Sequence, residues 1–345
     1  MVIYSPDTYH ARLLSTRERA LTFHEDADYD TWKVAVSEKL EELLGDMPEE
    51  IVPLNLRVEW EQDYPDYIER RLVFDTEPTI SVPCHLLIPK KAKKPCPVII
   101  CLQGHSTGMH VSMGRKKFAR DEEVVGTNDD DFALQAIKEG YAALALEQRG
   151  FGERVSPKSI GRNPHYRTAC YAPTMTALLL GRTMLGERIW DISRAIDMLE
   201  TIPEIDSQRI ACMGNSGGGT ATYYAACIEE RIKVAMPSCC VCTFEESIGA
   251  LHHCVCNYLP NMAKYFDMGE IACMIAPRKL LVVAGMTDVG FLIKGSMDAN
   301  KVIEKVYEKA GCPENVRFVI GEGGHKFYPD PAWKVFAELS GWKEE

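Results

Sequence analysis

Short, nearly continuous hydrophobic runs recur through the second part of the chain, and longer amphipathic segments separate them. The runs lie at 98–102, 142–146, 209–213, 234–236, 280–284 and 316–320. Runs of this length are typical of strands buried on both faces of a sheet. We expect helices between them at 131–139, 186–200, 217–229, 294–310 and 331–340. This alternation predicts an α/β fold in which helices cover both faces of a mostly parallel sheet.

The first 90 residues have a different pattern. Residues from about 8 to 50 are polar, with a weak helical stripe of Leu40, Leu43 and Leu44. Alternating hydrophobic and polar residues follow at 56–60, 67–74 and 80–88, which is typical of antiparallel strands. We therefore predict an N-terminal helical extension over residues 1–54. Residues 55–345 would form one large domain whose sheet starts with antiparallel strands.

Two long segments, 106–130 and 243–278, interrupt the alternation of strands and helices. Insertions after strands of such sheets usually lie above the C-terminal strand ends, where ligands bind. We therefore expect them to form a lid and substrate contacts. His253 and Tyr258 in the second segment, and Gln103 just before the first, are candidate substrate-binding residues. The alternative is that the second segment only packs a pair of surface helices.

Composition narrows the choice of partners. A chain of 345 residues with 46% hydrophobic and 26% charged residues suits a large globular α/β domain. The formal net charge of −11 argues against nucleic acid and against an anionic membrane surface as partner. No hydrophobic run is long enough to span a bilayer, and the first residues lack the basic and apolar regions of a signal peptide.

The chain contains 13 cysteines at irregular spacing. An odd number without a regular framework indicates reduced thiols, so we expect a cytoplasmic location. Cysteines and histidines gather between 239 and 256, but adjacent cysteines such as Cys239 and Cys240 rarely both reach one tetrahedral ion. We expect these thiols to pack as small hydrophobic groups, and we expect neither a metal nor another cofactor.

The segment 214–218 reads Gly-Asn-Ser-Gly-Gly between a predicted strand and a run of small residues that predicts a helix. Strand, G-x-S-x-G and helix together form the nucleophile elbow. The turn is tight, so the residues around the serine must lack side chains. Ser216 would then be a nucleophile at a helix N-terminus, and the N–H of Gly217 would stabilise negative charge on the substrate. The alternative is a glycine-rich turn without chemistry.

A serine nucleophile needs a base within hydrogen-bond reach and an acid that orients the base. Of the nine histidines, only His325 follows the last hydrophobic strand, in a glycine-rich loop. Asp288 follows the strand 280–284 across a short turn. The order serine, acid, histidine is that of the hydrolase triad. Weaker alternatives for the acid are Asp298, Glu304 and Glu322.

The second donor to an oxyanion should come from the loop after the strand 98–102, which reads Gln-Gly-His-Ser. We expect the N–H of His105 to be that donor. Its imidazole would form a wall of the pocket rather than act as a second base, because one base suffices; an ordinary loop histidine is the alternative.

These motifs together resemble the acetyl xylan esterase-like branch of the α/β-hydrolases, which includes cephalosporin-C deacetylases and relatives of dienelactone hydrolases and prolyl oligopeptidases. The resemblance runs from about residue 80 onward and rests on residues 103–105, 149–152, 190–197, 214–218, 275–281 and 323–325. It implies that Ser216, Asp288 and His325 form a triad that hydrolyses carboxylic esters, often acetyl groups on sugars, without a metal. Two positions depart from that branch: Gly217 replaces a glutamine and His105 replaces a tyrosine, as in a sister branch.

The sequence thus predicts a serine hydrolase that acts on a carboxylic ester of a small molecule or carbohydrate. A peptidase or amidase on the same scaffold is the enzymatic alternative, although no long N-terminal propeller sequence is present to gate peptides. A binding protein that kept the fold without catalysis is the alternative from another class. Homo-oligomerisation is left open by the sequence.

Overall fold

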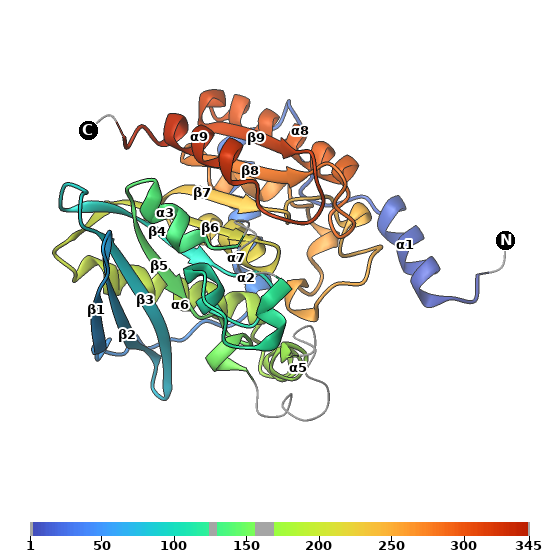
Figure 1. The fold of residues 1–345 in the computed structure, drawn as a ribbon. Coiled ribbons are helices and arrows are strands. Elements are labelled where there is room, and N and C mark those ends of the chain that lie inside the picture. The colour runs from blue at the N-terminus through green and yellow to red at the C-terminus, as the bar shows by residue number, and fades with distance from the viewer. Residues whose placement is uncertain (1–2, 124–129, 156–168, 344–345) are drawn as a thin grey trace.

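The structure is a computed structural model that describes residues 3–123, 130–155 and 169–343. Its centre is a nine-stranded sheet of order β1-β2-β3-β5-β4-β6-β7-β8-β9 (Figure 1). The strands are β1 (Arg57–Asp63), β2 (Tyr67–Glu77), β3 (Ile80–Pro89), β4 (Cys96–Leu102), β5 (Ala142–Leu146), β6 (Ile205–Asn215), β7 (Ile232–Ser238), β8 (Lys279–Gly285) and β9 (Val316–Gly321).

The type of strand pairing changes once across the sheet. The pairs β1–β2, β2–β3 and β3–β5 are antiparallel, and every other neighbouring pair is parallel. This confirms the predicted mostly parallel sheet with antiparallel strands at its start. Because the parallel strands run in one direction, the loops after β4, β6, β8 and β9 meet at the same edge of the sheet.

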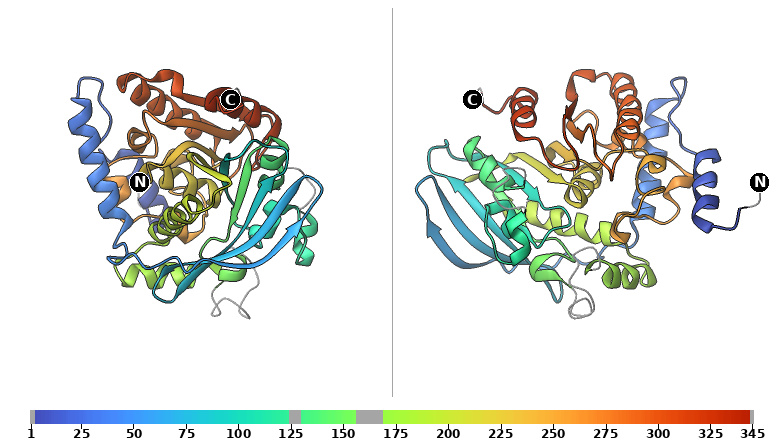
Figure 2. Two further views of the ribbon diagram at one scale, coloured as in Figure 1. Left: turned by 90° about the vertical axis from the view of Figure 1, so that its left-hand side faces the viewer. Right: turned by 45° about the vertical axis from the view of Figure 1, so that its right-hand side comes forward.

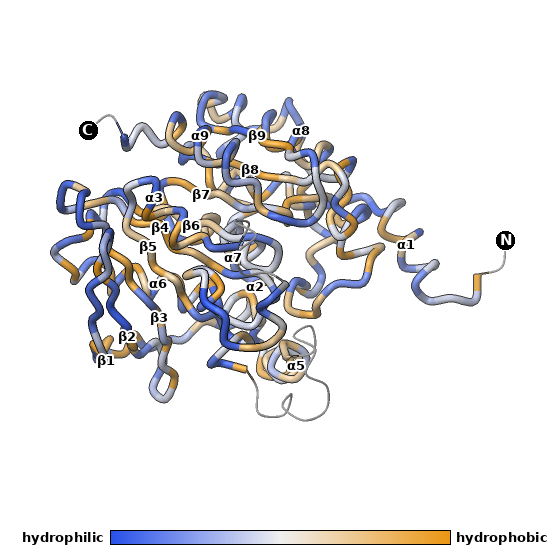
Figure 3. Tube along the Cα trace, viewed as in Figure 1, coloured by the Kyte–Doolittle hydropathy of each residue, from blue (hydrophilic) through white to orange (hydrophobic). Residues whose placement is uncertain are grey.

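Helices cover both faces of the sheet, and alternate residues of each strand pack against them. On β4, Ile99 and Cys101 belong to one core cluster, and Val98 and Ile100 belong to the other. The first cluster includes α3 (Phe132–Lys138) and α9 (Pro329–Ser340); the second includes α2 (Tyr29–Leu44), α6 (Met184–Glu200), α7 (Gly217–Ile228) and α8 (Ile293–Lys309). Figure 3 shows the hydrophobic residues concentrated in the central strands.

The helical prediction for residues 8–50 is confirmed in part. Two separate helices lie there, α1 (Pro6–Thr16) and α2, and no helix follows α2 before β1. The side chain of Asp28 caps the start of α2 by accepting a hydrogen bond from the N–H of Thr31 (2.9 Å). Whereas α1 buries no residue and lies on the outside of the molecule (Figure 2), α2 packs Val36 and Leu40 into the common core. The separate extension over 1–54 therefore stays a prediction.

The two predicted insertions contain only short 3-10 turns in the part of the chain that the structure describes; residues 124–129 lie outside it. The turns are η1 (Met109–Met113), η2 (Ala119–Glu123), η5 (Phe244–Glu246), η6 (Val255–Asn257), η7 (Met262–Lys264) and η8 (Glu270–Met274); the remaining described elements are η3 (Gly152–Arg154), η9 (Pro313–Asn315) and α5 (Tyr171–Leu179). The sequence did not predict α5. Over the described ranges, every helix is too short or too polar to cross a bilayer.

Candidate active site

Ser216 occupies a strained turn between β6 and α7. Its φ of 57° and ψ of −123° lie where residues with a Cβ rarely occur. The glycines on either side of Ser216 are needed because a side chain would clash at each position. A Cβ on Gly214 would lie 2.5 Å from the carbonyl carbon of Gly218, and a Cβ on Gly218 would overlap the carbonyl oxygen of Leu102. The turn places Ser216 directly before the first turn of α7, whose backbone N–H groups have no partner within the helix.

Asp288 and His325 are joined by a hydrogen bond. The Nδ1 of His325 lies 2.8 Å from Oδ2 of Asp288, so the two loops after β8 and β9 bring together residues that are 37 positions apart. The other carboxylate oxygen accepts hydrogen bonds from the N–H groups of Gly290 (2.7 Å) and Phe291 (3.1 Å). Burial raises the pKa of Asp288, but the His325 bond and these N–H groups outweigh burial and hold it below its usual value.

The rings of His325, Phe291 and His253 form a row in which Phe291 lies between the two imidazoles. The ring of Phe291 stacks on the imidazole of His325 at 14° with centroids 5.8 Å apart, and His253 packs edge-on against Phe291 at 4.8 Å. The Nε2–H of His253 donates to the carbonyl of Gly290 (2.8 Å). Burial lowers the pKa of His253, so its ring is neutral at neutral pH. The row holds His325 in one orientation without supplying a second charge.

A cavity of about 360 Å³ brings most of the candidate residues together. Its lining includes Gln103, His105, Ser216, His253 and His325. Both inserted segments contribute to it, through residues such as Thr107 and His252; their role as a lid and in substrate contacts stays a prediction. Tyr258 is not among the residues that line it in the described structure. The hydroxyl of that residue donates to the carbonyl of Ile248 (2.7 Å), and its side chain is 40% exposed.

The loop after β4 passes directly over the nucleophile. A Cβ on Gly104 would lie 2.9 Å from the carbonyl oxygen of Asn215 and 3.1 Å from Cβ of Ser216, so a larger residue would push this loop away from the nucleophile. A Cβ on Gly217 would lie 2.6 Å from Cε1 and 2.7 Å from Nδ1 of His105. The imidazole therefore occupies the space that a side chain at 217 would need. The two departures from the acetyl xylan esterase branch, at 105 and 217, are parts of one arrangement.

Two buried glutamines fix this loop. Nε2 of Gln148 donates to the carbonyl of Gln103 (2.6 Å), and Nε2 of Gln103 donates to Ser112 and to the carbonyl of Asp130 (2.9 Å). Within the described residues, Oε1 of Gln103 is buried and has no hydrogen-bond partner. A buried amide oxygen at the cavity is an acceptor that a substrate hydroxyl could satisfy.

An acid and a histidine that the sequence reasoning missed hold the first insertion. Oδ2 of Asp121 accepts hydrogen bonds from the N–H groups of Lys117 (2.7 Å) and Phe118 (2.9 Å) and from Nε2 of His110 (2.9 Å). Burial raises the pKa of Asp121, but these bonds outweigh it and lower that pKa to about 2. Asp121 lines the cavity, so a permanent negative charge lies on its wall. The described lining contains no lysine or arginine.

Glu147 lies directly after β5 and was also missed. Its side chain is 2% exposed; one oxygen accepts from the N–H of Met109 (3.1 Å) and the other from the N–H of Glu153 (3.3 Å). Burial raises its pKa to about 7. The residue ties the first insertion to the loop after β5. A buried acid after a hydrophobic strand is a weak signal in a sequence, because its burial depends on the loops that cover it.

The order of strands, the strained serine at a strand-to-helix turn and the acid–histidine pair at the same sheet edge define an α/β-hydrolase fold. A model of the Abhydrolase family, Abhydrolase_7, matches residues 10–327, and the chain belongs to that family. The resemblance inferred from the motifs is confirmed at the level of the superfamily.

Known proteins with similar sequences and structures agree. The protein YtaP of Bacillus subtilis, which is named as a hydrolase, is 27% identical over 82% of this chain and 90% of its own. A Bacteroides fragilis protein assigned as an acetyl xylan esterase has a TM-score of 0.75 at 19% identity, over 93% of this chain and 83% of its own. A glucuronoyl esterase from Solibacter usitatus has a TM-score of 0.72 at 18% identity, over 96% and 98%. At these identities the solved structures establish the fold.

Proposed function

We propose that this protein is a serine esterase with Ser216 as nucleophile, His325 as general base and Asp288 as the orienting acid. The observation that carries the proposal is the bond of 2.8 Å between His325 and Asp288, on the same cavity that Ser216 lines from its strained turn. A structural ion pair has no need of a strained serine beside it, whereas a triad needs all three groups.

The proposed reaction follows from these roles. Oγ of Ser216 attacks the ester carbonyl while Nε2 of His325 takes its proton. The N–H groups of Gly217 and His105 hold the oxyanion, which is worth about 10²–10³ in rate for each donor. His325 then protonates the leaving alcohol, and the acyl-enzyme forms. Water, deprotonated by His325, attacks the acyl carbonyl and releases the acid. Asp288 stays ionised throughout and stabilises the imidazolium.

The cavity favours a neutral, hydroxylated substrate. The carboxylate of Asp121, one of two aspartates that line it with Asp130, would repel an anion. Polar groups on other sides, from Gln103, Asn257 and His253, suit hydroxyl groups. Two of the similar structures are of an assigned acetyl xylan esterase and a glucuronoyl esterase, so we propose a carbohydrate ester as substrate class. A cytoplasmic location likewise stays a proposal; it rests on the reduced cysteines.

A fluorophosphonate probe and an ester panel test the proposal together. The probe should label the wild type and not Ser216→Ala, whose hydrolysis should fall about 10⁶-fold. Ser207→Ala, at the other end of β6, is the matched control and should keep both properties. The panel compares acetyl and longer acyl esters of sugars, a methyl uronate ester and matched amides. Labelling at another residue, or activity in Ser216→Ala above a tenth of wild type, would refute the assignment.

A further inference from the structure

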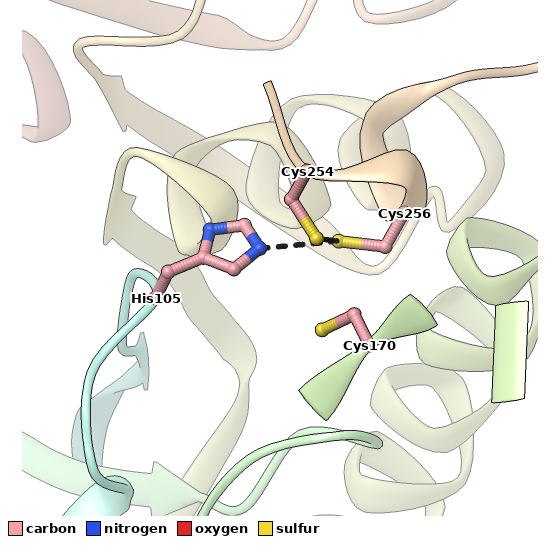
Figure 4. Close-up of side chains that lie close together, drawn as sticks. All are labelled: His105, Cys170, Cys254 and Cys256. Atoms are coloured by element: carbon pink, nitrogen blue, oxygen red, sulfur yellow. Dashed lines mark hydrogen bonds between the residues drawn. The ribbon is translucent and has the colours of Figure 1, made fainter. Parts of the chain in front are cut away.

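Four side chains that can each offer one ligand atom to a metal ion gather beside the loop after β4. We call His105, Cys170, Cys254 and Cys256 the thiol–imidazole cluster. One ligand atom of each lies within 4.8 Å of the others. Figure 4 shows the four side chains pointing toward one another from three different segments: the loop after β4, the start of α5 and the turn η6. The proposed reaction uses only the backbone N–H of His105 and gives the three thiols no role.

The spacing within the cluster fits a small tetrahedral ion. Nε2 of His105 lies 3.2 Å from Sγ of Cys256, and that sulfur lies 3.3 Å from Sγ of Cys254. A zinc ion with Zn–S bonds of about 2.3 Å holds its sulfur ligands about 3.8 Å apart. The short pairs would open by a few tenths of an ångström, and the longest separations would close by about one. Small side-chain rotations are enough for both.

A buried arginine next to the cluster supplies an independent argument. Arg188 is 1% exposed, and its guanidinium lies 3.4 Å from Sγ of Cys256 and 3.3 Å from Sγ of Cys170. Its other contacts are the carbonyl of Arg149 (2.8 Å) and the face of the Phe151 ring, 4.5 Å from the guanidinium carbon, and over the described ranges no carboxylate pairs with it. A buried cation without an anion is costly. Metal-bound thiolates would give the guanidinium the negatively charged partners that carboxylates do not provide here.

We propose that the thiol–imidazole cluster binds one Zn²⁺ ion. Three thiolates, one neutral imidazole and Zn²⁺ carry a net charge of −1, which the guanidinium of Arg188 neutralises. Binding releases the three thiol protons to solvent. Four protein ligands fill a tetrahedral shell, so the site is structural and offers no open position to a substrate. Sulfur and nitrogen donors in this number favour zinc over magnesium or calcium.

The ion would fasten the oxyanion loop to the rest of the site. His105 binds it through Nε2, while its Nδ1 edge packs over Gly217 and its backbone N–H is the proposed oxyanion donor. Zinc thus joins the loop after β4 to the second insertion, through Cys254, which also lines the cavity. The sequence expectation of no metal considered residues 239–256 alone. The other two ligands come from distant segments, which that reasoning did not combine.

Metal analysis of the purified full-length protein tests the proposal without an activity assay, so its outcome is separate from that of the esterase assignment. After growth with zinc and dialysis, the wild type should hold about one zinc per chain. In Cys170→Ser and Cys256→Ser the retained zinc should fall at least about tenfold. Cys227→Ser is the matched control, because that buried thiol contacts the carbonyl of Ile271 far from the cluster; it should keep its zinc. A zinc-free wild type, or unchanged zinc in both ligand variants, would overturn the proposal.

Two measurements on the wild type keep the test valid if the variants do not fold. Exchange with Co²⁺ should give a sulfur-to-cobalt charge-transfer band and the visible bands of a tetrahedral ion. An unfolded, chelator-treated sample should titrate all 13 thiols. Two fewer thiols would reveal a disulfide in place of a metal site, and a cobalt spectrum without the sulfur band would place the ion elsewhere. Either result overturns the proposal.

Discussion

The contact between Gly217 and the imidazole of His105 can be tested by adding one methyl group. In Gly217→Ala the new Cβ would lie 2.6 Å from Cε1 and 2.7 Å from Nδ1 of the ring, closer than real Cβ atoms approach other atoms. The ring cannot withdraw freely, because its Nε2 contacts Sγ of Cys256 at 3.2 Å and it packs edge-to-face with the ring of Phe151, with centroids 5.0 Å apart. The loop that carries the proposed oxyanion donor must therefore move with it.

Both stability and rate should change. Overpacking of this kind costs about 1–3 kcal/mol. Gly217 starts α7, where alanine would otherwise gain up to about 1 kcal/mol over glycine, so any net loss reports the clash. Displacement of one oxyanion donor lowers kcat by about 10²–10³-fold, and KM should change far less, because the donor acts mainly on the transition state.

The assay combines steady-state hydrolysis of an acetyl ester with urea unfolding of four proteins: the wild type, Gly217→Ala, His105→Ala and the double variant. Removal of the ring removes the clash, so the double variant should be about 1–3 kcal/mol more stable than the sum of the single changes. Gly311→Ala is the control, because φ is +73° there and open space surrounds the position. It should lose stability without losing kcat.

Two results would refute this reasoning. One is a Gly217→Ala variant that keeps at least half of the wild-type kcat. The other is additive stability within about 0.5 kcal/mol across the cycle, because neighbours that clash cannot behave independently.

Other predictions follow from single contacts. Asp288→Asn should lower kcat about 10³–10⁴-fold with the fold retained by circular dichroism; a drop below tenfold would exclude it as the orienting acid. The buried carboxyl of Glu147 binds its proton more tightly in the folded chain, with a pKa of about 7 against 4.5. Its contribution is therefore complete below pH 4.5, and about 3 kcal/mol of stability is lost as the pH rises to 7 and beyond. In Glu147→Gln this loss should vanish from urea unfolding curves at pH 5 and 8, and an equal pH dependence in both proteins would contradict the argument. His253→Ala should change the ratio of kcat/KM between esters, whereas Tyr258→Phe should leave that ratio unchanged and cost about 1 kcal/mol through the lost bond to Ile248. A changed ratio in Tyr258→Phe with an unchanged ratio in His253→Ala would instead indicate that Tyr258 contacts the substrate.

Much of the fold could be predicted because its central strands, such as β4, β5 and β8, are buried on both faces. A strand such as β8 has no polar face, so a continuous hydrophobic run identifies it without knowledge of its neighbours. The helix α5 could not be predicted, because its sequence has no clear division into a polar and an apolar face. Its residues are apolar with little amphipathic pattern, and several of them, such as Leu179 at 88% exposure, face outward in the described structure.

Some of the candidate site residues could be predicted from the sequence in the same way, and others could not. Ser216, Asp288 and His325 could be predicted because each follows a recognisable strand, and the ends of parallel strands share an edge. Side-chain direction could not be predicted: Tyr258 lies in the correct segment, but its hydroxyl bonds to Ile248 instead of facing the cavity. Clusters built from distant segments carry no local pattern at all. His105 and Cys256 are 151 positions apart in the sequence, so their contact could be recognised only in the folded structure.

The shared space between positions 105 and 217 also constrains how such a site can evolve. A lineage with histidine and glycine cannot acquire a larger residue at 217 first, because the imidazole already fills that volume. The ring at 105 must be replaced by a smaller residue before residue 217 becomes larger. The intermediate, with small residues at both positions, then has a cavity beside the nucleophile. Cavities in packed regions cost stability, but they are tolerated more readily than overlap of a side chain with a fixed ring. We therefore expect substitutions at 105 and 217 to be epistatic, with a preferred order of replacement. Ancestral intermediates with glycine at 217 and a small residue at 105 are the ones to reconstruct.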